Sequence, residues 1–355
     1  MSLKHAFFRR SAPIFGIFAL LASIVCAACL GSVTVPLPEV AAIMWAHFPG
    51  HDGALPSSLN EAAPAYEQIV WELRVPRTCA AVLVGAILAV TGVVLQALVR
   101  NPLADSSIIG ASAGASLAAV LAAAIGLGGG TGAWITQTPL FACAGAVVAL
   151  AAVLLLAAPR GGITGTRVIL TGVAVGQILM AAVSFVQLRL APADSSAILF
   201  WLLGSVAGVD DIHRVGLPAL ASLAVIAVLW LRARSVDVIS LGDDDAIALG
   251  IAPHRLKWAL VLAVGLLTGI AVGLAGTVSF FGLLVPHAVR IFTGPSHRWL
   301  LPTSAVWGGA GLVLIDIASR TLGGGQELPL SIFTALLGGP LFVLLLGRSG
   351  YGGAR

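Results

Sequence analysis

Few residues of this chain have the types and spacing that catalysis requires. The only two lysines are Lys4 and Lys257, and neither follows a glycine, so the Gly-Lys-Ser/Thr loop that cradles nucleotide phosphates does not occur. The sequence also contains no His-Glu-x-x-His zinc motif. We therefore do not expect an enzyme, and in particular not a chain that hydrolyses ATP by itself.

The cysteines and histidines give only weak signals of metal or redox chemistry. Cys26 and Cys29 form a Cys-x-x-Cys pair, but no histidine or second pair is nearby, so we interpret them as small buried apolar residues. His287 and His297 flank one loop and are interpreted as solvated loop histidines. No cofactor or metal is predicted in this chain.

Arginines mark both ends of one long apolar stretch around which the chain is organised. Arg74 and Arg77 precede the stretch, Arg100 closes it, and Gln96 is the only strongly polar side chain within it. Residues 78–99 carry no charge, and at about 1.5 Å per residue they can cross a hydrocarbon core of about 30 Å. The pattern predicts a membrane-spanning helix with a functional group at each end.

The composition indicates that lipid is the solvent. Of 355 residues, 59% are hydrophobic and 10% are charged, and the mean hydropathy is +1.03. A soluble domain carries roughly 25% charged residues. The net charge is only +4, and no basic cluster has interleaved aromatic residues, so we expect no nucleic-acid partner. The sequence predicts an all-α integral membrane protein.

Apolar runs predict ten transmembrane helices in a single domain, residues 1–355. The runs lie at about 13–33, 76–99, twice within 106–159, 167–189, 213–231, twice within 258–289, 299–320 and 328–347. Segment 195–209 is too short to cross and is predicted to be a half-helix or an interfacial segment. The first run is longer than a signal-peptide core, so a retained helix is favoured over a cleaved signal. Residues 34–72 are predicted to be an outer loop with one or two short amphipathic helices, and residues 232–257 an inner loop.

The distribution of basic residues indicates the orientation. With the N-terminus inside, ten crossings place fourteen Lys and Arg residues inside and five outside, which agrees with the positive-inside rule. Both termini are therefore predicted to be cytoplasmic. The five outer residues are Arg74, Arg77, Arg189, Arg214 and Arg320.

Two features suggest how the helices pack. Predicted spans 2–5 and 7–10 each begin with a Gly/Ala-rich helix and a polar junction that contains proline, which favours an inverted internal repeat. Small-residue faces such as Gly110-x-x-x-Gly114 and Gly269-x-x-x-Gly273 are expected to pack helices within the chain. A subunit interface is the alternative for one of them.

Acidic residues are scarce in the predicted spans. An ion-coupled transporter usually buries an acid at mid-membrane. Asp316 lies towards the outer end of the ninth span, where it could pair with Arg320 four residues on. This pattern argues against ion coupling, and it suggests that a partner supplies the energy.

The inner loop contains a predicted short helix. Its residues are Asp243, Asp244, Asp245, Ala246, Ile247, Ala248, Leu249 and Gly250. The acids suit a helix N-terminus, where Asp243 could act as the cap, and Gly250 suits the end. Apolar side chains at Ala246, Ile247 and Leu249 would then dock a cytoplasmic partner. A helix packed against its own loop is the alternative.

Three outer arginines lie at predicted helix ends, namely Arg74, Arg77 and Arg320. Interfacial snorkelling would need no partner. The functional interpretation is a basic collar that receives an acidic protein surface.

Several motifs, in order along the chain, resemble the FecCD-type permeases of ABC importers. In the first half they are Arg74-Val-Pro-Arg77, Gly85-Ala86, Gln96, Asn101-Pro-Leu-Ala104 and Gly110. In the second half they are Gly276-Thr-Val-Ser-Phe-Phe-Gly-Leu-Leu-Val-Pro-His287, Arg290, Gly294-x-x-His297-Arg298, Leu301-Pro302, Asp316, Arg320, Glu327-Leu-Pro329 and Gly338-Gly-Pro340. The resemblance covers residues 70–347, and residues 1–70 match only in general character.

The resemblance implies the type II ABC importer permease fold in a bacterial inner membrane. It further implies a permease homodimer, two cytoplasmic ATPase subunits that use ATP and Mg, and a periplasmic substrate-binding protein. Arg74, Arg77 and Arg320 would dock the binding protein, and Asp243–Gly250 would be the helix that couples to the ATPase. The fifth helix, the half-helix after it and the tenth helix would line the pathway. The cytoplasmic gate would consist of Asn101, Gly161, Gly162, Ile163, Thr164 and Gly165, and this glycine-rich loop departs from the family pattern.

The family carries iron–siderophore complexes, haem and cobalamin. The segment 294–302 resembles haem permeases somewhat more than the others, so haem is the favoured cargo. Met180 and His213 could be drawn as axial haem ligands, but we interpret them as a packing residue and an interfacial residue. An ion-coupled secondary transporter and a membrane receptor or anchor are the alternatives from other classes.

Overall fold

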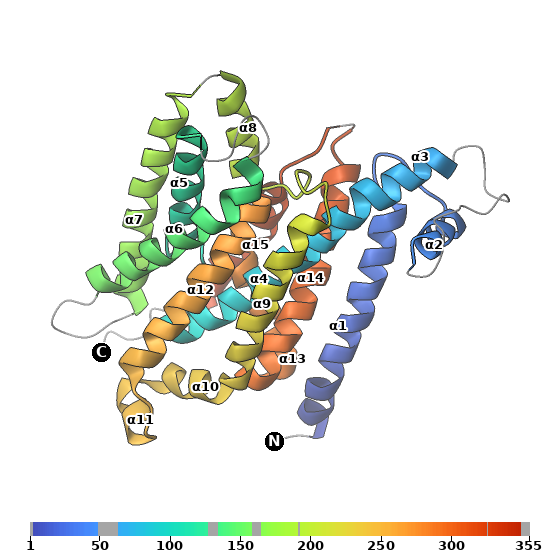
Figure 1. The fold of residues 1–355 in the computed structure, drawn as a ribbon. Coiled ribbons are helices and arrows are strands. Elements are labelled where there is room, and N and C mark those ends of the chain that lie inside the picture. Colours follow the sequence, from blue (N-terminus) through green and yellow to red (C-terminus); the bar gives the residue numbers. More distant parts are fainter. Residues whose placement is uncertain are drawn as a thin grey trace.

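The computed structural model describes residues 3–48, 63–126, 134–157, 165–190, 192–324 and 326–348. Within these residues the chain forms helices and no strand, so the predicted fold class is confirmed. The longer helices run side by side in one bundle, with short helices at both ends (Figure 1). The longer helices are α1 (Leu3–Cys29), α4 (Val75–Val99), α6 (Trp134–Ala157), α7 (Gly165–Gln187), α9 (His213–Leu231), α12 (Pro253–Ala275) and α14 (His297–Thr321).

Among the described residues, seven helices are long and apolar enough to cross a membrane. Three shorter apolar helices, α5 (Ala111–Ala124), α13 (Phe281–Thr293) and α15 (Leu330–Arg348), lie where the third, eighth and tenth spans are predicted. The predicted half-helix is α8 (Pro192–Leu202), which follows α7. The order of predicted spans is therefore found in the structure.

The predicted outer loop is more helical than its sequence suggested. It contains α2 (Leu37–Ala46) and α3 (Ala63–Glu67), and the π-helix η1 (Gln68–Arg74) joins α3 to α4 without a break. The second span was predicted to begin near residue 76, because Glu67 and Glu72 make the preceding turns polar. The helical hydrogen bonds nevertheless continue across these turns.

The helix α2 is not amphipathic, contrary to the prediction for this loop. Val40 and Ile43 are buried against the chain, while Leu37, Met44 and Trp45 are 56%, 42% and 63% exposed. An exposed face of this kind suits the membrane interface, where tryptophan is enriched, better than it suits water.

Helix contacts repeat between the two predicted units. The first helix of each unit packs on the third helix of the other, since α4 packs on α14 and α12 packs on α6. Likewise, α4 contacts α13 and α12 contacts α5. This reciprocal pattern is what a two-fold relation between the two units produces, and it agrees with the predicted internal repeat.

Glycines permit the closest of these contacts. A Cβ added at Gly85 of α4 would lie 2.2 Å from the carbonyl oxygen of Gly308 in α14. A Cβ added at Gly269 of α12 would lie 2.2 Å from Cα of Cys143 in α6. The prediction that small-residue faces pack helices within the chain is confirmed for Gly269, and α4 is buried along most of its length.

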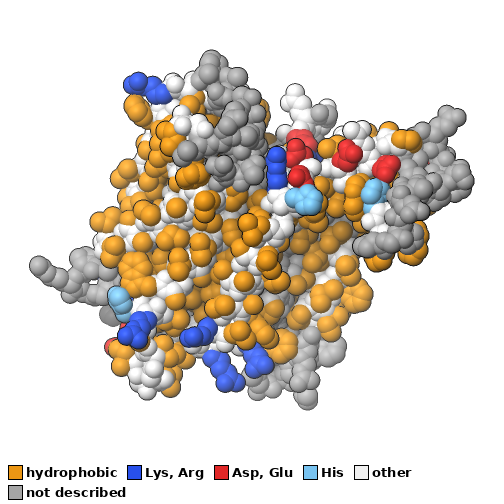
Figure 2. All heavy atoms as spheres, in the orientation of Figure 1, with side chains coloured by type: hydrophobic (Ala, Val, Ile, Leu, Met, Phe, Trp, Pro, Cys, Tyr) orange, Lys and Arg blue, Asp and Glu red, His pale blue; other side chains and the backbone are white. Residues whose placement is uncertain are grey.

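Charged side chains gather at the two ends of the bundle, and apolar side chains cover its flanks (Figure 2). One end carries α2, α3, η1 and the start of α4. The other carries α10 (Ala233–Leu241) and α11 (Asp243–Ala248). Because α4 connects the two ends, its first and last turns place functional residues on both surfaces.

Candidate functional site

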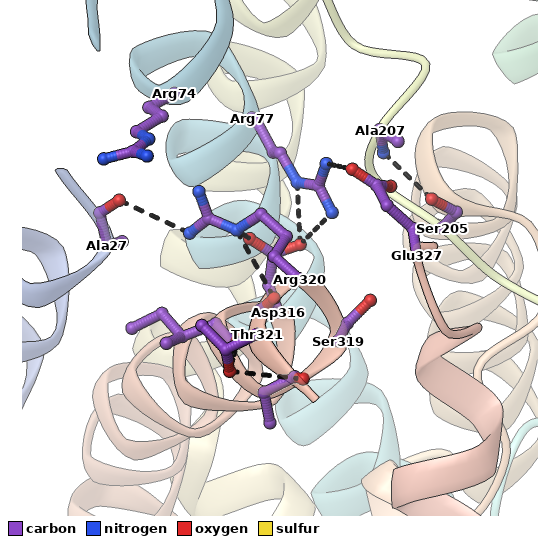
Figure 3. A network of polar contacts seen from close by, with 12 residues as sticks. Ala27, Arg74, Arg77, Ser205, Ala207, Asp316, Ser319, Arg320, Thr321 and Glu327 are labelled. Carbon is purple, nitrogen blue, oxygen red and sulfur yellow. Dashed lines mark hydrogen bonds and ion pairs between the residues drawn. The ribbon is translucent and has the colours of Figure 1, made fainter. Parts of the chain in front are cut away.

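Four charged side chains form a network at the first turn of α4 (Figure 3). Nε and Nη2 of Arg77 each lie 2.9 Å from Oδ1 of Asp316 in α14. Nη1 of Arg77 lies 2.5 Å from Oε1 of Glu327, in the segment before α15. Nε of Arg320 lies 3.2 Å from Oδ2 of Asp316, which confirms the predicted pairing of these two residues. We call these four residues the arginine network.

The network is buried at its centre and open at one edge. The side chain of Asp316 is 1% exposed, and those of Arg77 and Arg320 are 9% and 7% exposed, whereas Glu327 is 47% exposed. Buried charges are tolerated when they are paired. The two arginines and two acids balance one another, so the network can remain charged within the helix bundle.

Arg74 lies beside the network but bonds to a different segment. Its Nη1 donates to the carbonyl oxygen of Ala28 at 2.6 Å, and its Nη2 donates to the carbonyl oxygen of Val33. The three predicted docking arginines therefore gather at one end of the bundle (Figure 3). Their side chains make contacts within the chain rather than extending outward, and Glu327 is the exposed part of the cluster. Their docking role stays a prediction.

A cavity of about 390 Å³ lies beside Glu327. Its wall includes Phe200 and Trp201 of α8, Leu274 of α12, and Pro329. The lining is mostly apolar, and Glu327 provides its carboxylate. The exposed acid of the arginine network thus faces a space next to the half-helix.

Hydrogen bonds join the three elements around this cavity. Thr277 Oγ1, just after α12, donates to the carbonyl oxygen of Leu202 at the end of α8 at 2.5 Å. Ser331 Oγ of α15 donates to the carbonyl oxygen of Thr277 at 2.7 Å. The backbone N–H of Leu330 donates to the carbonyl oxygen of Gly204 at 2.9 Å. The half-helix is therefore tied to the start of α15.

At the opposite end of α4, two of the predicted gate residues meet. Arg100 ends the helix in the left-handed conformation, with φ 53°. Asn101 Oδ1 then accepts the backbone N–H of Leu103 at 2.9 Å. A Cβ added at Gly165, the first residue of α7, would lie 2.6 Å from the carbonyl oxygen of Val99 and 3.5 Å from Cβ of Asn101. The remaining predicted gate residues, Gly161, Gly162, Ile163 and Thr164, lie outside the described residues.

The predicted inner helix is confirmed as α11, and we call residues Asp243–Gly250 the coupling segment. Asp243 does not cap the helix as predicted, because Gly242 occupies the N-cap position. Instead Asp243 Oδ2 lies 2.6 Å from Nζ of Lys257 in α12. Ala246 is fully buried against the chain, whereas Ile247 and Leu249 are 62% and 63% exposed. The exposed apolar surface is therefore smaller than predicted and consists of two large side chains.

The coupling segment lies close to the end of α4. A Cβ added at Gly242 would lie 3.4 Å from Nη1 of Arg100. The helix before it, α10, is attached to α14 because Asp237 Oδ1 accepts the backbone N–H of His297 at 2.9 Å and lies 2.6 Å from its ring Nδ1. His297 is only 5% exposed, so its interpretation as a solvated loop histidine is wrong.

The structure also reveals a buried acid that the sequence did not single out. Asp105 is 1% exposed, and its carboxylate is bonded by the backbone N–H and hydroxyl of Ser107, at 2.9 and 2.5 Å. A Cβ added at Gly282 of α13 would lie 2.6 Å from its Oδ2 and 2.8 Å from the carbonyl oxygen of Leu88. The acid is thus satisfied where the turn after α4 folds back against α4 and α13. No group of three or more His, Cys, Asp or Glu side chains in the described ranges is arranged to hold a metal ion.

Comparison with known proteins gives consistent matches. The sequence model of the FecCD transport family matches residues 19–348. The uncharacterized ABC transporter permease protein YvrB of Bacillus subtilis is 36% identical over 345 residues, which cover 97% of this chain and 96% of YvrB. The vitamin B12 import system permease protein BtuC of Vibrio cholerae is 38% identical over 287 residues, covering 80% of this chain and 84% of BtuC.

A solved structure gives the same fold. It is described as an inward-facing conformation of an ABC transporter assigned to the metal-chelate type, and it aligns with a TM-score of 0.74 and 28% identity. The alignment covers 94% of this chain and 98% of that one.

Proposed function

Because the chain belongs to the FecCD transport family, we propose that it imports a metal chelate from the periplasm to the cytoplasm. It is a multi-pass membrane permease of the ABC importer class rather than an enzyme. The observation that best supports the mechanism is the position of the coupling segment beside the end of α4, with Ile247 and Leu249 exposed. A partner that binds these two side chains can move α11 relative to the end of α4, where the predicted gate residue Asn101 lies.

The proposed assembly contains two copies of the permease, two cytoplasmic ATPase subunits that use ATP and Mg, and a periplasmic binding protein. The dimer is proposed from the family, and the apolar faces of α7 and α15, where Ile178 and Leu336 are each 69% exposed, are compatible with a subunit contact and equally with lipid. In this arrangement α7, α8 and α15 line the pathway, and the inner membrane holds both termini on its cytoplasmic side. The arginine network and Arg74 lie where the binding protein docks.

Alternating access follows from this arrangement. ATP binding and hydrolysis in the partner move the coupling segment, and the contact between Asn101 and Gly165 opens or closes in response. Asp316 and Asp105 do not resemble a free ion-coupling site, since Asp316 pairs with two arginines and Asp105 is bonded by Ser107. This favours energy from ATP over an ion gradient.

The identity of the transported chelate is a more specific proposal than the class of transporter. We propose haem as the cargo on the resemblance of residues 294–302, and cobalamin is the second candidate because BtuC, a vitamin B12 permease, is a relative. A ferric siderophore is the third member of the same class. The pathway is expected to bind its cargo weakly, because a tight site would slow release.

A panel of chelates tests the proposal. The permease reconstituted with its ATPase and binding protein should hydrolyse ATP faster when the binding protein carries its cargo. Haem, cobalamin and ferric siderophores are compared at equal concentration, and the cargo should stimulate ATP hydrolysis at least several-fold more than the other two. Equal rates with all three and with no chelate would contradict a chelate importer.

A further inference from the structure

We infer that Glu327 occupies the position on Arg77 that an acidic side chain of the docking binding protein takes over. This inference rests on the proposed function, because it assumes that a binding protein docks at the arginine network. It adds a residue of opposite charge to that surface and assigns it a role. The acid acts as an internal competitor for the docking partner.

The geometry distinguishes the two acids of the network. Asp316 accepts a hydrogen bond from Nε of Arg77, forms an ion pair with its Nη2 and also contacts Arg320, and its side chain is 1% exposed. Glu327 bonds only Nη1 of Arg77, and its side chain is 47% exposed. An incoming carboxylate cannot reach the position of Asp316 without opening the helix bundle. It can reach Nη1 of Arg77 by replacing Glu327.

The charges favour an exchange rather than a simple addition. Arg77 and Arg320 carry two positive charges, and Asp316 and Glu327 carry two negative charges, so the network is already neutral. A further carboxylate at Arg77 would meet Glu327 at close range, and like charges repel. If Glu327 leaves as the new acid enters, the network remains neutral and the buried arginine remains paired.

The displaced side chain has a place to go. Glu327 lines the cavity of about 390 Å³ that it shares with Phe200 and Trp201 of α8. The next residues are fixed, because the backbone N–H of Leu328 donates to the carbonyl oxygen of Ser319 at 3.2 Å. Exchange at Arg77 therefore moves the carboxylate of Glu327 beside the half-helix, which links docking to a wall of the proposed pathway.

The substitution Glu327→Gln tests the inference because it removes the competitor without changing the shape of the side chain. Affinity for the binding protein is measured with the purified complex of permease and ATPase, at low salt where charge screening is weakest. We expect binding about two- to five-fold tighter than wild type, the range expected for an exposed ion pair. The binding protein is the same one that is used in the ATP-hydrolysis assay.

Glu72→Gln is the matched control. Glu72 is exposed on η1, and no ion pair is found for it among the described residues. The substitution Glu72→Gln therefore removes the same charge from the same end of the molecule without freeing Arg77. Its affinity should stay within about two-fold of wild type.

Unchanged or weaker docking of Glu327→Gln, or an equal effect of Glu72→Gln, would overturn the competitor role. Failure of the wild-type complex to dock the binding protein would instead overturn the proposed function, so the two failures are distinguishable. Correct folding of both variants is checked by retention of the ATPase and an unchanged elution volume. If Glu327→Gln does not fold, Glu327→Asp replaces it, because the shorter side chain retracts from Arg77 and should also bind more tightly.

Discussion

Replacing Ile247 and Leu249 together with aspartate is expected to detach the ATPase subunits and abolish ATP-driven uptake. Burying a large aliphatic side chain contributes about 1.5–3 kcal/mol, and both side chains are more than half exposed in the single chain. The double change removes that contribution and adds two charges that the interface would have to desolvate. We expect the affinity for the ATPase to fall at least about a hundred-fold, measured by co-purification in detergent.

The control places the same charges at the opposite end of the bundle. Leu73 and Leu322 are 54% and 69% exposed, and their replacement by aspartate should leave the ATPase attached. The substitutions at Ile247 and Leu249 should not unfold the permease, because Ala246 provides the buried contact of α11. If the doubly substituted permease still co-purifies with its ATPase, the coupling segment is not the ATPase contact.

Asp316→Asn is expected to cause the largest loss of stability among single changes in the arginine network. Its carboxylate is 1% exposed and contacts both Arg77 and Arg320. The amide would leave two buried guanidinium groups without full compensation, and breaking a buried pair in this way costs about 3–5 kcal/mol. The midpoint of thermal unfolding in detergent should fall by several degrees.

Glu327→Gln provides the comparison for this prediction. Its carboxylate is 47% exposed, so its loss should change stability by no more than about 1 kcal/mol. If Asp316→Asn and Glu327→Gln shift the unfolding midpoint equally, then the buried acid does not hold the network together. The contrast between the two acids would then have no energetic basis.

The fold could be predicted because each membrane helix is specified by residues that are neighbours in the sequence. Apolar runs located the spans, and a segment too short to cross located α8. The acids before Ala246 and the glycine at position 250 located α11, since helix ends depend on neighbouring residues. Small-residue spacing predicted that Gly269 would pack against another helix. It did not identify α6 as the partner.

Contacts between distant residues could not be predicted in the same way. His297 is buried because Asp237, sixty residues earlier, accepts its protons. Asp105 follows a proline-containing turn that looks exposed, yet the chain folds back against Gly282. The arginines at the outer end were expected to extend outward, and the structure shows that Glu327 and the carbonyls of Ala28 and Val33 hold two of them instead. Each of these cases depends on a long-range pairing that carries no local pattern.

Uptake into sealed proteoliposomes tests the central claim most directly, namely that this chain provides a pathway and that a separate ATPase drives it. Vesicles with the permease, its ATPase, ATP and cargo-loaded binding protein should accumulate the chelate. Vesicles with the permease alone should not, even under a proton or sodium gradient. Accumulation by the permease alone under such a gradient would contradict the account and identify an ion-coupled transporter.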